Sequence, residues 1–138
     1  MFKRILVPVD LTKKSQAAVD LAYEFATRSP TEVILQHVIE TIEHVQFDEL
    51  KPFYERLEKS ARKGLGQFSQ PFAAGKLSVD QVIVYGRRAN EIVSYAAAKR
   101  VDLIIMSSHR IESNQPAHNW SISYAVAILA PCPVLLVK

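Results

Sequence analysis

The 138-residue chain has few glycines, and this scarcity limits the ligand sites it can build. The four are Gly64, Gly66, Gly75 and Gly86. Loops that wrap a phosphate closely generally need glycine, because side chains block the approach and many such turns require a positive φ. Neither G-x-G-x-x-G nor a Walker lysine motif occurs in the sequence. A glycine-rich phosphate loop of either kind is therefore excluded.

Cysteine and long apolar runs are scarce as well. Cys132 is the single cysteine, so an intramolecular disulfide cannot form. No apolar run approaches the roughly 20 residues that a membrane span needs. The apolar start of the chain stops at Asp10, and no secretory signal pattern is visible. We therefore expect a cytoplasmic protein that does not span a membrane.

The charge of the chain does not indicate a nucleic-acid partner. The 17 basic and 14 acidic residues leave a net charge of +3. The basic residues are scattered, apart from short pairs such as Lys13-Lys14 and Arg87-Arg88, and form no stripe. Arg87 and Arg88 could attract an anion, or they could lie on an ordinary solvated face.

Apolar strands alternate with amphipathic helices along the whole chain. This alternation predicts a single α/β domain over residues 1–138, with an open parallel five-stranded sheet and helices on both faces. Gly64 and Gly66 are expected to fray the end of the second helix. The predicted strands cover 3–10, 31–38, 79–86, 101–108 and 134–138, and the predicted helices cover 13–28, 46–70, 89–100 and 118–129.

In such a sheet a ligand lies outside the carboxyl ends of the strands, where the strand order reverses. Asp10 follows the first strand, and the segment 107–121 follows the fourth. A connection of this length is usually functional or disordered. Asp10 could accept hydrogen bonds from a ligand, or it could cap the predicted helix 13–28 or bond to nearby backbone.

No catalytic or metal-binding constellation is evident. A triad of Ser107, His109 and Asp10 would lack the G-x-S-x-G turn that supports such a nucleophile. A phosphoacceptor role for Asp10 would need an acidic cluster and an acceptor after the third strand, which ends in Val84-Tyr85-Gly86. The four histidines do not have zinc-site spacing. The sequence therefore predicts neither a catalytic residue nor a metal.

Five segments together resemble the universal stress protein family over essentially the whole chain. They are KRILVPVD, QHVIE, YGRRANEIV with Arg88 in place of a proline, DLIIMSSHR, and ILAPCPVLLVK. The resemblance implies a Rossmann-like fold of the adenine nucleotide alpha hydrolase type with strand order 3-2-1-4-5. It also implies a homodimer that pairs the C-terminal strands. An apolar last strand with a free edge favours such pairing independently.

The resemblance also points to a nucleotide site in which the family pattern is only partly kept. Nucleotide-binding members carry G-x-x-G, nine residues, then G-S or G-T, and they place the base near the residues matching Asp10 and Val38. On this chain the three glycines become Ser107, Arg110 and Trp120, while Ser121 keeps the final hydroxyl.

Three hypotheses follow from this altered pattern. The favoured one is a non-catalytic stress protein of the subgroup that does not bind ATP and has no cofactor. The alternative is an AMP- or ATP-binding protein in which His109 and Arg110 pair directly with phosphate. A hydrolase is the third, and it would need a catalytic constellation that we do not find.

Overall fold

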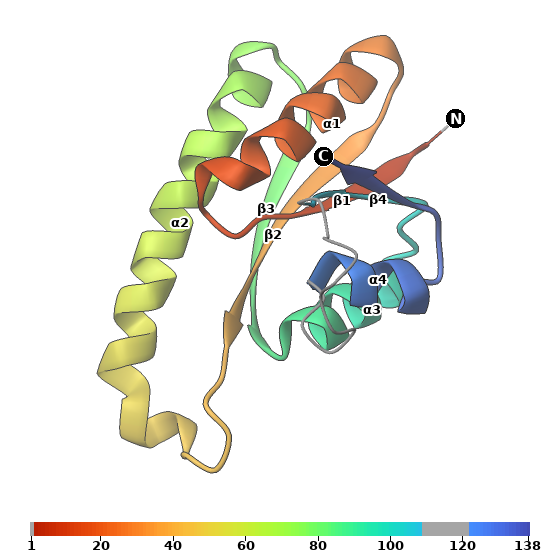
Figure 1. Ribbon diagram of the computed structural model, residues 1–138. Helices are drawn as coiled ribbons and strands as arrows, with labels where there is room; N and C mark the ends of the chain where they lie inside the picture. Colours follow the sequence, from red (N-terminus) through yellow and green to blue (C-terminus); the bar gives the residue numbers. More distant parts are fainter. Residues whose placement is uncertain (1, 109–121) are drawn as a thin grey trace.

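The structure is a computed structural model that describes residues 2–108 and 122–138 (Figure 1). The strands are β1 (Arg4–Pro8), β2 (Glu32–Glu40), β3 (Val79–Gly86), β4 (Leu103–Ser107) and β5 (Val134–Val137). The helices are α1 (Gln16–Arg28), α2 (Lys51–Ala74), α3 (Arg88–Ala98) and α4 (Ile122–Leu129). Two 3-10 turns, η1 (Lys13–Ser15) and η2 (Phe47–Leu50), precede α1 and α2.

The five strands form one sheet in the order β3-β2-β1-β4-β5, and every adjacent pair is parallel. This arrangement confirms the predicted fold class and strand order. Helices α1 and α2 cover one face of the sheet, and α3 and α4 cover the other (Figure 1). The strand order reverses at β1: β2 and β3 are added on one side of it, and β4 and β5 on the other.

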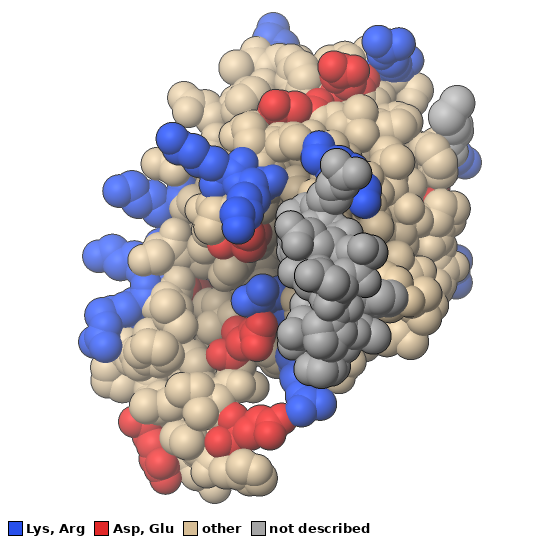
Figure 2. Space-filling model, viewed as in Figure 1, with Lys and Arg blue, Asp and Glu red and all other residues tan. Residues whose placement is uncertain are grey.

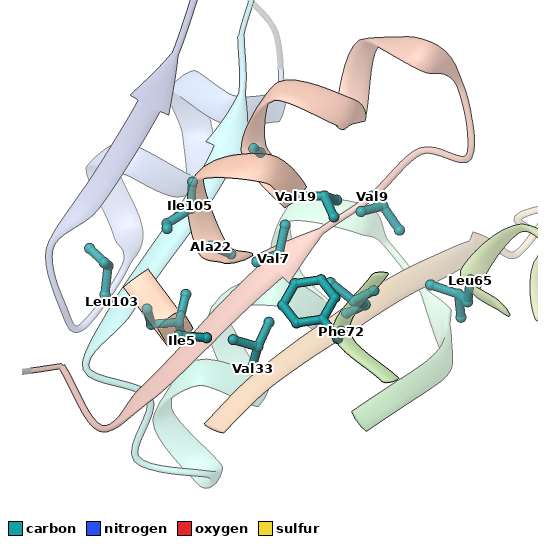
Figure 3. Close-up of a cluster of buried hydrophobic side chains, with 13 residues drawn as sticks. Ile5, Val7, Val9, Val19, Ala22, Val33, Leu65, Phe72, Leu103 and Ile105 are labelled. Carbon is teal, nitrogen blue, oxygen red and sulfur yellow. The ribbon is translucent and has the colours of Figure 1, made fainter. Parts of the chain in front are cut away.

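Alternate residues of the central strands supply two separate apolar cores. On β1, Ile5 and Val7 face α1 and α2, while Leu6 faces α3 and α4. Figure 3 shows the first core, which contains Val7 of β1, Val19 of α1 and Phe72 of α2. Burial on both faces explains why these strands are almost continuously apolar in the sequence.

Helix α2 is longer than predicted, and the expectation that its glycines fray its end was wrong. The helix continues past Gly64 and Gly66, includes Pro71, and ends at Ala74. Phe72 lies in its last turn and is fully buried. We attribute the extra turn to the burial of Phe72, because tertiary packing routinely overrides local helix propensity.

The ends of several other elements also differ from the sequence-based prediction. Helix α3 ends at Ala98, so Lys99 and Arg100 follow the helix and do not form its last turn. Strand β2 continues to Glu40. The predicted start of the last helix, 118–121, lies outside the described residues. Within the described part of the chain, no helix is long and apolar enough to cross a membrane.

Candidate functional site

A pocket of about 530 Å³ lies at the carboxyl ends of the strands, beside β1, where the strand order reverses. Of the predicted site residues, Asp10, Val38 and Ser107 line this pocket. His109, Arg110, Trp120 and Ser121 lie outside the described residues, so their roles remain predictions. The pocket volume is within the usual range for small-molecule sites.

Asp10 shapes the turn between β1 and α1. Its Oδ1 accepts hydrogen bonds from the backbone N–H of Thr12 at 2.9 Å, from Thr12 Oγ1 at 2.7 Å and from Ser15 Oγ at 2.8 Å. Ser15 Oγ in turn accepts a hydrogen bond from the Asp10 N–H at 3.0 Å. Within the described residues, Oδ2 of Asp10 accepts no hydrogen bond, which leaves it available to a ligand.

These contacts keep Asp10 ionised. Partial burial by itself would raise its pKa. The hydrogen bonds from Thr12 and Ser15 and the positive charge of Arg88 outweigh burial, so the pKa lies below its ordinary value. Asp10 is therefore a hydrogen-bond acceptor at neutral pH and is poorly suited to donate a proton.

Ser107 has a structural contact of its own. Its Oγ accepts a hydrogen bond from the backbone N–H of Ala18, in the first turn of α1, at 3.3 Å. Ser123, which also lines the pocket, donates from Oγ to Ser108 Oγ at 3.1 Å. The Ser107 hydroxyl therefore joins the end of β4 to the start of α1 and also contributes to the pocket wall.

The pocket has a predominantly positive rim. Lys14, Arg88 and Lys138 are the cationic side chains among its described lining residues, and Asp10 is the one carboxylate. Arg88 forms an ion pair with Glu40 at 2.9 Å, whereas Arg87 forms one with Glu43 away from the pocket. Both arginines are therefore ion-paired with a glutamate, and Arg88 is the one of the two that also lines the pocket.

Lys14 and Lys138, which come from opposite ends of the chain, line the pocket but were not predicted as site residues. Gln36, which is fully buried in β2 and lines the same pocket, was not predicted either. Gln36 could have been noticed as a polar residue inside an otherwise apolar strand. No comparable signal marks the two lysines, because lysine is common on any surface.

Neither a metal centre nor a reactive thiol is found among the described residues. No group of three or more potential metal ligands occurs in residues 2–108 and 122–138. Cys132 is half-buried against the second core, and both burial and the charge of Asp102 raise its pKa. The thiol is therefore protonated at neutral pH and serves in packing.

Over the molecule as a whole, charges of both signs are present. Lys and Arg side chains extend from the outer edge along α2, and Asp and Glu side chains gather near the turn that leads from β2 into α2 (Figure 2). On the face that Figure 2 shows, side chains of both signs are therefore present.

Comparison with known proteins gives a consistent result. The family model of the universal stress protein family matches residues 1–138. The universal stress protein YxiE of Bacillus subtilis is 26% identical, with all of both chains covered. The universal stress protein MJ0577 of Methanocaldococcus jannaschii is 28% identical, with 100% of this chain and 96% of the relative covered.

Solved structures show the same similarity. The MJ0577 structure has a TM-score of 0.83 at 29% identity and covers 100% of this chain and 96% of its own. A universal stress protein in complex with cAMP has a TM-score of 0.75 at 20% identity, covering 99% and 97%. An Arabidopsis thaliana family member with AMP bound has a TM-score of 0.72 at 15% identity, covering 99% and 91%.

Proposed function

The chain belongs to the universal stress protein family, and from this premise we propose that it is a stress protein that binds an adenine mononucleotide in its pocket. We further propose that it acts by binding and not by catalysis, as one domain over residues 1–138 in the cytoplasm. The observation that carries the proposal is the combination, in one pocket, of an ionised Asp10, an apolar wall and a positive rim.

Each part of a mononucleotide has a suitable partner in this pocket. Val38, Ile92 and Met106 provide apolar surface for a flat base. The free Oδ2 of Asp10 can accept a hydrogen bond from an amino or hydroxyl group. Lys14, Arg88 and Lys138 can pair with phosphate oxygens.

A single phosphate suits the chain better than three. The family's phosphate loop has lost its glycines at the positions of Ser107, Arg110 and Trp120. The Oγ of Ser107 already accepts a hydrogen bond from the backbone N–H of Ala18 in α1. Separate cationic side chains can hold one phosphate without a backbone cradle, but a triphosphate needs more contacts. Of the hypotheses from the sequence, we therefore favour the nucleotide-binding one, with AMP and not ATP as the ligand.

Ligands of proteins with the same fold agree with this choice. One structure with this fold is described in complex with cAMP, and another with AMP bound. Both ligands contain adenine, one ribose and one phosphate. Their identities to this chain are low, so they support the type of ligand and not the individual contacts.

We also propose that the protein forms a homodimer through β5 and acts through interactions of the dimer surface. This strand lies at the edge of the sheet, and its Leu135 is 38% exposed. On the adjacent α4, Ile128 and Leu129 are 66% and 58% exposed. An edge strand beside exposed apolar side chains favours pairing with a second copy.

The test is thermal unfolding with AMP, ADP and ATP. AMP is expected to raise the melting temperature in a concentration-dependent way, because a ligand that binds the native state stabilises it by linkage. Loss of one charged phosphate contact in Arg88→Ala should weaken AMP binding roughly tenfold. Arg87→Ala is the matched control, because Arg87 pairs with Glu43 outside the pocket, and it should leave AMP binding unchanged.

Two outcomes would contradict the nucleotide proposal. No shift in melting temperature at millimolar AMP would leave the dimer surface as the proposed functional feature. Equal losses of affinity in Arg88→Ala and Arg87→Ala would show a nonspecific charge effect and not a contact in the pocket.

A further inference from the structure

We infer that Gln36 recognises the base of the bound nucleotide, by pairing its side-chain amide with the amino-bearing edge of adenine. The inference rests on the proposed nucleotide binding and adds a residue that determines base specificity. Gln36 lies within β2 and lines the pocket together with Val38, two residues further along the strand.

Within the part of the chain that the structure describes, the Gln36 side chain is buried and has no hydrogen-bond partner. Its exposed fraction is 0%, and neither Oε1 nor Nε2 has a hydrogen-bond partner among the described residues. Its backbone carbonyl, by contrast, accepts a hydrogen bond from Val9 N–H at 2.8 Å. The unpaired groups are therefore confined to the side chain.

The surrounding sheet cannot satisfy this amide. Pro8 on β1 and Val82 on β3 are the residues directly opposite Gln36 in the two adjacent strands. Ile34 and Val38 precede and follow it on the same face of β2, because alternate strand residues share a face. All four neighbours have apolar side chains. Among the described residues, the neighbours of Gln36 in the sheet offer no polar side chain. A polar partner can therefore reach its amide from the pocket.

A buried amide without a partner costs free energy, and most buried polar groups in proteins are hydrogen-bonded. A leucine would fill a similar volume in this apolar wall at no such cost. A glutamine at this position is thus better explained by an interaction made when the pocket is filled than by the stability of the free protein.

The chemistry of the amide selects the ligand. A side-chain amide presents one acceptor, Oε1, beside donors on Nε2. Adenine presents the complementary pair, its 6-amino donor beside a ring-nitrogen acceptor, and Gln pairs with adenine in this two-point manner. Asp10, an ionised acceptor, can supply only half of such a pair. Gln36 therefore provides recognition that the carboxylate cannot.

The experiment combines two ligands with three proteins in calorimetric titrations. The ligands are AMP and purine riboside 5′-monophosphate, which has hydrogen in place of the 6-amino group. The proteins are the wild type, Gln36→Leu and the matched control Gln81→Leu. Gln81 lies on the neighbouring strand β3, and its Nε2 donates to Ser69 Oγ at 2.7 Å, so its amide already has a protein partner.

We expect the wild type to prefer AMP over the analogue about tenfold, the effect of one well-formed hydrogen-bond pair. Gln36→Leu should lower AMP affinity by a similar factor and bring the preference close to one. Gln81→Leu should change neither quantity. In the absence of ligand, Gln36→Leu should melt at a temperature equal to or above that of the wild type, because it removes an unpaired buried amide.

The other outcomes separate the two proposals. If the wild type binds neither ligand, both the nucleotide function and the role of Gln36 are overturned. If AMP binds but Gln36→Leu keeps the wild-type preference, the role of Gln36 alone is overturned. If Gln36→Leu lowers the melting temperature of the free protein, the amide has a structural partner and the inference is wrong.

Discussion

At the scale of single residues, Asp10 both shapes a turn and lines the pocket. Its Oδ1 accepts the hydrogen bonds that shape the turn into η1, while Oδ2 accepts none within the described residues. The sequence left open a ligand role and a local structural role, either capping of the next helix or bonding to nearby backbone. The structure shows the bond to nearby backbone, and Thr12 is the N-cap of η1. The two roles are compatible, because the two oxygens of a carboxylate can have different partners.

Asp10 should also give a measurable pH dependence of stability. At pH 7, Asp10→Ala should lower the free energy of unfolding by about 1 kcal/mol, because it removes the acceptor of the hydrogen bonds from Thr12 and Ser15. Because the folded-state pKa of Asp10 is below its ordinary value, its contribution is present above that value and is lost as the pH falls through the folded-state pKa.

Urea denaturation of both proteins at pH 7, 5 and 3 measures this effect. The difference between wild type and Asp10→Ala should be the same at pH 7 and 5 and smaller at pH 3. A difference that remains constant down to pH 3 would show that the hydrogen bonds from Thr12 and Ser15 do not favour the ionised form.

At the scale of elements, the two glycines of helix α2, Gly64 and Gly66, differ in what surrounds them. An added Cβ at Gly64 would lie 2.8 Å from Cδ2 of Leu11, whereas at Gly66 it would have no neighbour within 4 Å. Leu11 itself has a φ of 69°, so the turn after β1 directs this side chain against α2. Gly64 therefore permits a close contact, while Gly66 only lowers helix propensity.

Substitution should distinguish the two glycines. Gly66→Ala should raise the free energy of unfolding by about 0.5–1 kcal/mol, the usual gain for alanine over glycine within a helix. Gly64→Ala should gain less, because Leu11 must move to accommodate the methyl group. Urea denaturation measures both values. A larger gain for Gly64→Ala than for Gly66→Ala would contradict the assigned contact.

At the scale of the whole molecule, the sheet has two edge strands, β3 and β5. The β5 edge is short and is flanked by the exposed apolar side chains of α4. Strand β3 carries Asp80, an exposed acidic residue of the kind that discourages edge pairing. This contrast favours β5 as the edge that joins two copies.

Replacement of Leu135 by lysine tests the proposed dimer. A charge at the centre of the paired strands should convert the dimer to monomer in sedimentation experiments, because unpaired buried charge is costly. Ile42→Lys is the control, since Ile42 is also an exposed apolar residue, at 49%, but follows β2. A dimer that survives Leu135→Lys would contradict pairing through β5.

The sequence by itself determined the layered sheet, the approximate position of each element and the place of Asp10 after the first strand. These features depend on short-range patterns of apolar residues, which can be identified without knowing which strands are neighbours. The resemblance to a family added the strand order, which the pairing of β1 with both β2 and β4 then confirmed.

Only the tertiary structure revealed how residues distant in sequence meet at the pocket. Lys14 and Lys138 converge there because β1 and β5 lie on either side of β4. Phe72 extends α2 because the face of the sheet offers it a buried place. The unpaired amide of Gln36 is evident only when Pro8 and Val82 are known to be its neighbours. Such neighbours depend on strand register, which the pattern of a single strand does not specify.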